Sequence, residues 1–180
     1  MNCHPYKIWL WAINILGGTA VIASYAIGII THPQTRGALW GNVPKALLPW
    51  YTVSMLAAAA GYCAFSYYIL FRVDPEGATV AGRFSYGVFP WLYALILVPS
   101  ALWMPLTFAM IGNPSPLLWV AVRVVLGVTG IASLLLLAAI IALEPHEPVW
   151  PHRIAVVGCA AFSLQTAFLD ALVWPYYFPS

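Results

Sequence analysis

Long apolar stretches alternate with short polar connectors along this chain. Each stretch has about the 20 residues that a helix needs to cross a hydrocarbon layer about 30 Å thick. The five stretches are Ile8–Ile30, Trp50–Phe71, Val88–Ile111, Leu117–Leu143 and Ile154–Trp174. Because backbone polar groups find no water in lipid, such stretches predict helices. The pattern therefore predicts an all-α integral membrane protein, a single transmembrane domain over residues 1–180 that forms a bundle of five transmembrane helices.

Composition excludes an ordinary soluble domain. Hydrophobic residues make up 63% of the chain and charged residues only 7%, against about 25% charged residues in soluble domains. The formal net charge of +2 provides no basic stripe, so we expect no nucleic-acid partner. Membrane lipids are the expected surroundings.

Basic residues in the connectors predict the orientation, because Lys and Arg concentrate in cytoplasmic loops. An odd number of spans places the two termini on opposite sides. The amino-terminal side carries Lys7, Arg72, Arg83 and Arg153, and the other side carries Arg36 and Lys45. We therefore expect a multi-pass protein with a cytoplasmic amino terminus.

Two connectors are informative. Thr31–Pro49 is the longest, and its apolar stretches, interrupted by Pro and Gly, predict an interfacial segment between helices 1 and 2. Gly112–Pro116 is a tight turn, which predicts that helices 3 and 4 are antiparallel neighbours.

Two charged residues fall inside the predicted spans, and a charge in a span is a functional-site hypothesis by default. They are Arg123 in the fourth helix and Asp170 in the fifth. At α-helical spacing, one face of the fifth helix carries Cys159, Ser163, Thr166 and Asp170, and one face of the fourth carries Arg123, Gly127 and Gly130. We predict that these faces pack together and that Arg123 pairs with Asp170. The alternatives are a purely structural pair and an Arg123 side chain that extends to the headgroups.

Prolines inside the third span predict a cavity. Pro99 and Pro105 each remove a helical hydrogen bond, and backbone carbonyls released in lipid commonly line a cavity. We expect a kink or opened turn there. The combined candidate ligand-binding residues are Arg123, Asp170, Trp103, Ser100, Tyr93, Thr166 and Ser163. A kink that packing alone accommodates is the alternative.

Small residues at helical spacing predict that helices 1 and 2 pack closely, with Asn14 requiring an interhelical partner. The first stripe contains Asn14, Gly18, Tyr25 and Gly28, and the second contains Ser54, Ala58, Gly61 and Phe65. The same surfaces could instead form a homodimer.

Other chemistry has little support in the sequence. No disulfide framework, phosphate loop or hydrolase motif occurs, and no cofactor is indicated. The residues Cys3, His4, Glu144, His146, Glu147 and His152 could approach one another as a Zn or Cu site, although their spacing fits no established motif; an ordinary interfacial loop is the main expectation.

The length, the five spans and the abundance of Trp and Pro are similar to those of the tryptophan-rich sensory protein (translocator protein) family. The similarity covers size and topology only, and no residue role follows from it.

Three classes of function are open. The preferred hypothesis is a protein that binds or transports a small apolar ligand or lipid through an intramembrane pocket. The second is an accessory or assembly subunit of a larger membrane complex. The third, a membrane-embedded enzyme acting on a lipid, has the least support, because no nucleophile, base and orienting group converge in the sequence.

Overall fold

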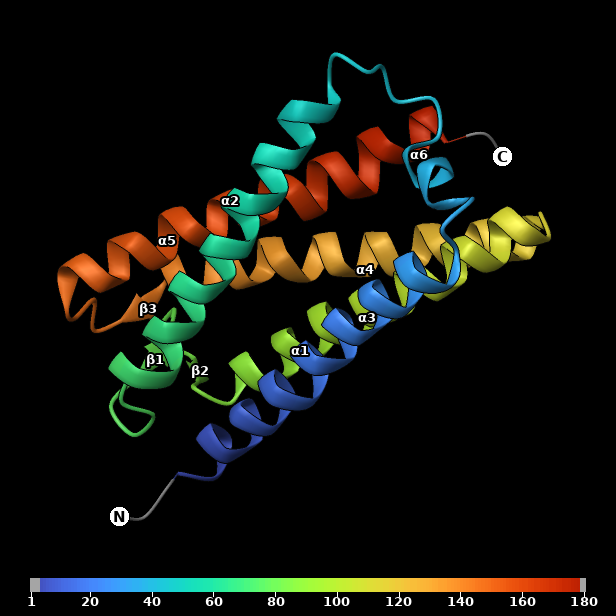
Figure 1. Ribbon diagram of the computed structural model, residues 1–180. Coiled ribbons are helices and arrows are strands. Elements are labelled where there is room, and N and C mark those ends of the chain that lie inside the picture. The colour runs from blue at the N-terminus through green and yellow to red at the C-terminus, as the bar shows by residue number, and fades with distance from the viewer. Residues whose placement is uncertain (1–3, 179–180) are drawn as a thin grey trace.

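The computed structural model describes residues 4–178, in which five helices are long and apolar enough to cross a membrane (Figure 1). The bounds are α1 Pro5–Thr31, α2 Leu48–Tyr67 continued by the π-helix η2 Tyr68–Arg72, α3 Val88–Gly112, α4 Pro116–Ile141, and α5 Val149–Ser163 continued by the π-helix η3 Leu164–Val173 and by α6 Trp174–Tyr177. All five predicted helices are confirmed, and the last begins at Val149 rather than Ile154.

The helix starts follow local sequence rules. Pro5 and Pro116 each occupy the first turn of a helix, where a missing N–H costs no intrahelical bond. The Ser115 hydroxyl caps α4 by accepting from the backbone N–H of Leu118 at 3.3 Å. The turn before Pro116 therefore reverses the chain, and α3 and α4 pack side by side as predicted.

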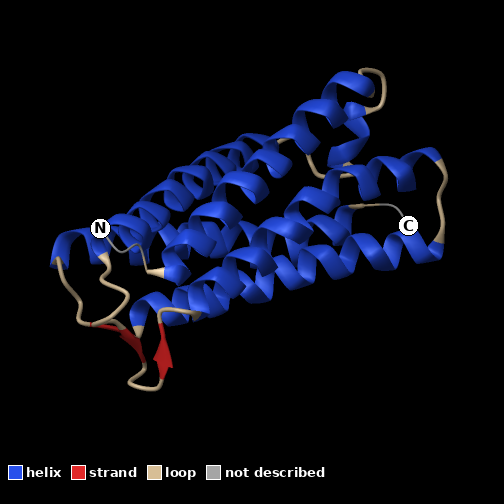
Figure 2. Ribbon diagram, turned by 90° about the horizontal axis from the view of Figure 1, so that it is seen from below, coloured by secondary structure: helices blue, strands red, loops and turns tan. Residues whose placement is uncertain are grey.

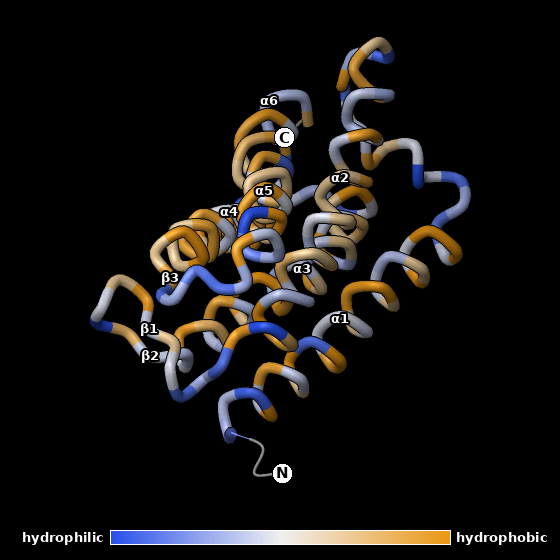
Figure 3. The backbone as a smooth tube through the Cα atoms, turned by 90° about the vertical axis from the view of Figure 1, so that its left-hand side faces the viewer, coloured by the Kyte–Doolittle hydropathy of each residue, from blue (hydrophilic) through white to orange (hydrophobic). Residues whose placement is uncertain are grey.

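The helices pack in a series: α1 on α3, α3 on α4, α4 on α5 and η3, and α5 on α2. The two ends of this series, α1 and α2, have no extensive contact with each other (Figure 3).

The predicted close packing of helices 1 and 2 is therefore wrong. A Cβ built at Gly28 in α1 would lie 2.6 Å from Cγ of Met104 in α3, and one built at Gly158 in α5 would lie 2.9 Å from Cα of Gly61 in α2. The small residues do permit close approach, but α1 approaches α3 and α2 approaches α5. A stripe of small residues allows close packing without determining which helix is the partner.

A small antiparallel sheet closes the amino-terminal end of the bundle (Figure 2). Its strands are β1 Thr79–Val80, β2 Phe84–Ser85 and β3 Leu143–Glu144, in the order β2-β1-β3. The sheet joins the connector after η2 to the connector after α4, as expected of connectors on one side. Tyr86 next to it is fully buried and donates to the carbonyl of Ile69 at 2.9 Å; burial raises the pKa of this phenol.

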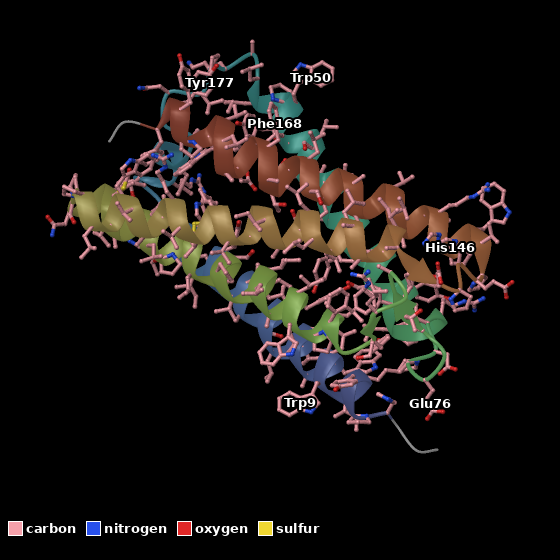
Figure 4. All side chains as sticks on the ribbon, turned by 180° about the vertical axis from the view of Figure 1, so that it is seen from behind. Trp9, Trp50, Glu76, His146, Phe168 and Tyr177 are labelled. Carbon is pink, nitrogen blue, oxygen red and sulfur yellow. The ribbon has the colours of Figure 1, made fainter. Side chains whose placement is uncertain are left out.

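Aromatic and aliphatic side chains form the core at the same end. Phe65, Phe89 and Tyr93 are buried there, and Tyr93 shares a 2.9 Å hydrogen bond with the Ser66 hydroxyl. Many large apolar side chains remain outside the core, and Trp9 and Trp50 are 65% and 72% exposed (Figure 4). The outer surface is therefore suited to an apolar solvent.

Candidate functional site

A cavity of about 780 Å³ lies between α1 and α2, the two helices that do not pack together. Its back wall comes from α3, α4 and the last helix, and its lining includes Ile96, Leu97 and Ser100 beside Pro99. A cavity is therefore present where the prolines of the third span predict one. The helix itself is continuous from Val88 to Gly112, so the expected opened turn is not present.

The cavity opens sideways between α1 and α2. Ile22 of α1 and Met55 of α2 line it and are also 72% and 42% exposed. Toward the amino-terminal end, Tyr62 of α2 donates to Oδ1 of Asn14 in α1 at 2.7 Å. Asn14 thus has the interhelical partner predicted for it, and its bond with Tyr62 bridges two otherwise separate helices.

The first connector covers the opposite end of the cavity. Its 3₁₀ helix η1, Arg36–Trp40, lies against the last helix, where the indole N–H of Trp174 donates to the carbonyl of Leu39 at 2.8 Å. The backbone N–H of Asn42 donates to the carbonyl of Tyr177, also at 2.8 Å. Leu39 and Trp40 line the cavity, so residues 36–42 form a cover anchored to the end of the chain.

Polar groups gather where the last helix lines the cavity. The amide Nε2 of Gln165 donates to Oδ1 of Asp170 at 2.7 Å. Within residues 4–178, two buried polar atoms of the cavity lining have no hydrogen-bond partner: Oε1 of Gln165 and Nε1 of Trp103. Buried polar atoms are normally satisfied, so a bound molecule is one explanation for this pair.

The π-helix explains why Gln165 reaches Asp170. In η3 the hydrogen bonds run over five residues rather than four, so residues five apart lie one turn apart. A sequence interpretation at α-helical spacing assigns these two side chains to different faces. Irregular π segments are frequent at functional sites.

Four of the predicted site residues line the cavity: Asp170, Trp103, Ser100 and Thr166. Two others lie in the packed interior. Tyr93 bonds to Ser66, and the hydroxyl of Ser163 donates to the carbonyl of Ser133 in α4 at 3.0 Å. They support the bundle rather than the cavity wall.

Arg123 does not line the cavity, and its predicted pairing with Asp170 is wrong. Its side chain is exposed, with the guanidinium carbon 6.0 Å from the centroid of the Trp119 ring. Among residues 4–178 the hydrogen-bond partner of Asp170 is Gln165. The prediction assumed α-helical geometry at Asp170. Asp170 instead lies in the π-helix η3, and it lines the cavity.

The hydroxyl contacts predicted between the last two helices do occur, at Gly130, one of the two glycines predicted to permit close approach. Thr166 donates to the Ser133 hydroxyl at 2.8 Å, and a Cβ at Gly130 would lie 2.9 Å from Cα of Ala167. At Gly127 a Cβ would meet no atom within 4 Å. The close contact therefore centres on Gly130 and Ser133.

Sequence reasoning missed several lining residues, including Tyr25, Tyr51 and Gln165. The rings of Tyr25 and Trp103 lie 5.6 Å apart between centroids, and the Tyr51 hydroxyl donates to the carbonyl of Leu169 at 3.5 Å. Gln165 offered a usable signal, since an amide inside a span must find a partner.

The metal hypothesis gains no support. Cys3 lies outside the described residues, and within residues 4–178 no three His, Cys, Asp or Glu side chains are arranged to hold a metal ion. The rings of His146 and His152 lie 4.6 Å apart, and their Nε2 atoms face the carbonyls of Ile141 and Ile140.

No protein family, curated protein or solved structure matches the chain.

Proposed function

We propose that this chain is a multi-pass integral membrane protein, with its amino terminus in the cytoplasm, that binds a small and largely apolar ligand in the cavity between α1 and α2. The ligand reaches the cavity from the lipid phase through the opening at Ile22 and Met55. Residues 36–42 cover the cavity at the other end.

The surface supports the membrane assignment. α1 has the hydropathy of a membrane span, yet only 6% of its most apolar window is buried. In water this helix would expose a large apolar surface, which soluble proteins avoid. In lipid the same surface is solvated, and the excess of Lys and Arg at and near the helix ends on the amino-terminal side supports the orientation.

The cavity is the observation that carries the function. Its volume of about 780 Å³ lies within the range of about 300–1,000 Å³ typical of small-molecule sites, which are mostly apolar with a few polar groups that fix orientation. Here the polar groups are Asp170, Gln165 and Trp103, two of which keep an unpartnered buried atom.

Cys63 provides a direct test, because it lines the cavity and is exposed, whereas Cys159 is buried. Diphenylpropanol, a neutral apolar probe, should slow the labelling of Cys63 by N-ethylmaleimide in protein reconstituted in nanodiscs. The protection should saturate with probe concentration, and mass spectrometry of the labelled peptide identifies the cysteine.

A cysteine introduced by Ala60→Cys is the matched control, since Ala60 is exposed on the same helix but does not line the cavity. Its labelling should not change with the probe. Equal protection at both positions, or none at Cys63, would refute binding in the cavity.

The orientation has its own test. In sealed cells, a membrane-impermeant thiol reagent should label a cysteine at Asn113 from outside, whereas a cysteine at Glu76 should react only after the cells are opened. The reverse result would invert the orientation.

A further inference from the structure

We infer that the ligand is a lipophilic amine, held with its ammonium group against Asp170 and its apolar body along the cavity wall. This inference rests on the proposed function, since it specifies the ligand of the same cavity.

The first step is the charge of Asp170. Its carboxylate lines an apolar cavity, and the hydrogen bond that the structure shows for its side chain comes from the neutral amide of Gln165. A carboxylate in a low-dielectric site is unfavourable unless a cation balances it. Arg123, the partner that the sequence predicts for Asp170, is exposed beside Trp119 instead, and a cationic ligand would supply the missing charge.

The second step is the orientation of Gln165. In the structure the amide nitrogen of Gln165 faces Asp170, which is the orientation that an ionised carboxylate requires, because it can only accept hydrogen bonds. The amide oxygen is then directed elsewhere, and in the structure it is buried without a donor. Gln165 is 5% exposed. An acceptor without a donor and a carboxylate without a cation therefore occur on neighbouring groups, and an ammonium N–H satisfies both.

The third step is the aromatic wall. The rings of Tyr25 and Trp174 lie 5.6 Å and 5.8 Å from the ring of Trp103, and all three residues line the cavity. Aromatic faces attract ammonium groups and also accommodate apolar bodies. The unpartnered Nε1 of Trp103 is a donor, and a hydroxyl or carbonyl oxygen on the ligand would accept from it.

Arg36 is the other charged residue of the lining, and it favours the opposite ligand charge. It lies in the first connector and is exposed, so solvent screens its charge. An anionic ligand would leave Asp170 without a balancing cation and the oxygen of Gln165 without a donor. The buried groups therefore favour a cation.

Three probes of the same shape and different charge test the inference: diphenylpropylamine, diphenylpropanol and diphenylpropanoic acid. Protection of Cys63 from N-ethylmaleimide measures the affinity of each in nanodiscs at neutral pH. A charge-assisted hydrogen bond should make the amine bind about tenfold more tightly than the alcohol. Equal affinities, or preference for the acid, would overturn the inference and leave the proposed function intact.

Asp170→Asn identifies the group responsible. In this variant the affinity for the amine should fall about tenfold, to that of the alcohol, while the affinity for the alcohol stays within about twofold. Glu76→Gln removes an exposed carboxylate outside the cavity and should change neither affinity. An amine affinity that survives Asp170→Asn would overturn the inference, and the comparison of probes on the unaltered protein stands even if the variant fails to fold. If none of the three probes protects Cys63, the proposed function itself is refuted.

Discussion

The hydroxyl of Tyr62 donates to Oδ1 of Asn14 at 2.7 Å, and this hydrogen bond joins α1 to α2 at one end of a cavity that otherwise separates them. Asn14 also donates through Nδ2 to the carbonyl of Leu10 at 2.8 Å. The Asn14 amide is thus held through both its oxygen and its nitrogen, and it links α1 to α2.

Tyr62→Phe should lower the free energy of unfolding by about 1 kcal/mol, because it leaves the Asn14 oxygen without a donor while keeping the aromatic packing. Denaturant-induced unfolding in mild detergent, followed by Trp fluorescence, measures the change. In the background of Asn14→Leu, Tyr62→Phe should cost less. Identical costs in the two backgrounds would show that the bond contributes nothing to stability.

Gly61→Ala should destabilise the protein by about 2 kcal/mol or more. The new methyl group would meet the backbone of Gly158, which cannot move aside as a side chain can, so α2 and α5 would have to separate. The same unfolding measurement applies. Gly127→Ala is the control, since a Cβ at Gly127 meets no atom within 4 Å; it should leave stability unchanged or raise it by up to about 1 kcal/mol. Equal effects would contradict the close helix contact.

Hydropathy and charge were sufficient to predict the five helices, because the lipid thickness imposes a length and the exclusion of charge marks the ends. They could not predict which helices are neighbours. Gly28 and Gly61 would permit close packing with any of several neighbouring helices. The prediction paired α1 with α2 only because they are consecutive in the sequence. In the structure these glycines contact α3 and α5, and that exchange of partners creates the cavity.

The cavity could be predicted in part. Pro99 marks a helix near which a cavity lies, and Trp103 and Asp170 were identified as lining candidates. Gln165 was missed because an α-helical register places it on a different face from Asp170, whereas the segment is π-helical. Arg123 was included wrongly because the same register places Asp170 opposite it. The π-helical turns of η3 depend on tertiary contacts of the whole helix, and no residue pattern in this segment predicts a π-helix.

Arg123 and Asp170 should make independent contributions to stability. The exposed Arg123 lies over the partly buried ring of Trp119, so Arg123→Gln should cost less than about 1 kcal/mol. In a double-mutant cycle with Asp170→Asn, the coupling energy should stay below about 0.5 kcal/mol, the value for residues without shared partners. Unfolding midpoints of the four proteins in the cycle give this number. A coupling above about 1 kcal/mol would restore the ion pair and contradict the observed position of Arg123.

Gly41→Ala should detach residues 36–42 from the end of the chain. Gly41 has a φ of +54°, which side-chain-bearing residues rarely adopt, and a Cβ there would lie 2.9 Å from the carbonyl oxygen of Tyr177. That carbonyl accepts the hydrogen bond from the N–H of Asn42, so the methyl group displaces the contact that anchors the cover. Hydrogen–deuterium exchange of peptides spanning residues 36–47 should become about fivefold faster or more, the factor that corresponds to about 1 kcal/mol of lost docking energy. Gly37→Ala is the matched control in the same segment, because a Cβ at Gly37 meets no atom within 4 Å, and its exchange should match that of the unaltered protein. If Gly41→Ala left exchange unchanged, residues 36–42 would not be held by Tyr177, and the cavity would lack the cover proposed for it.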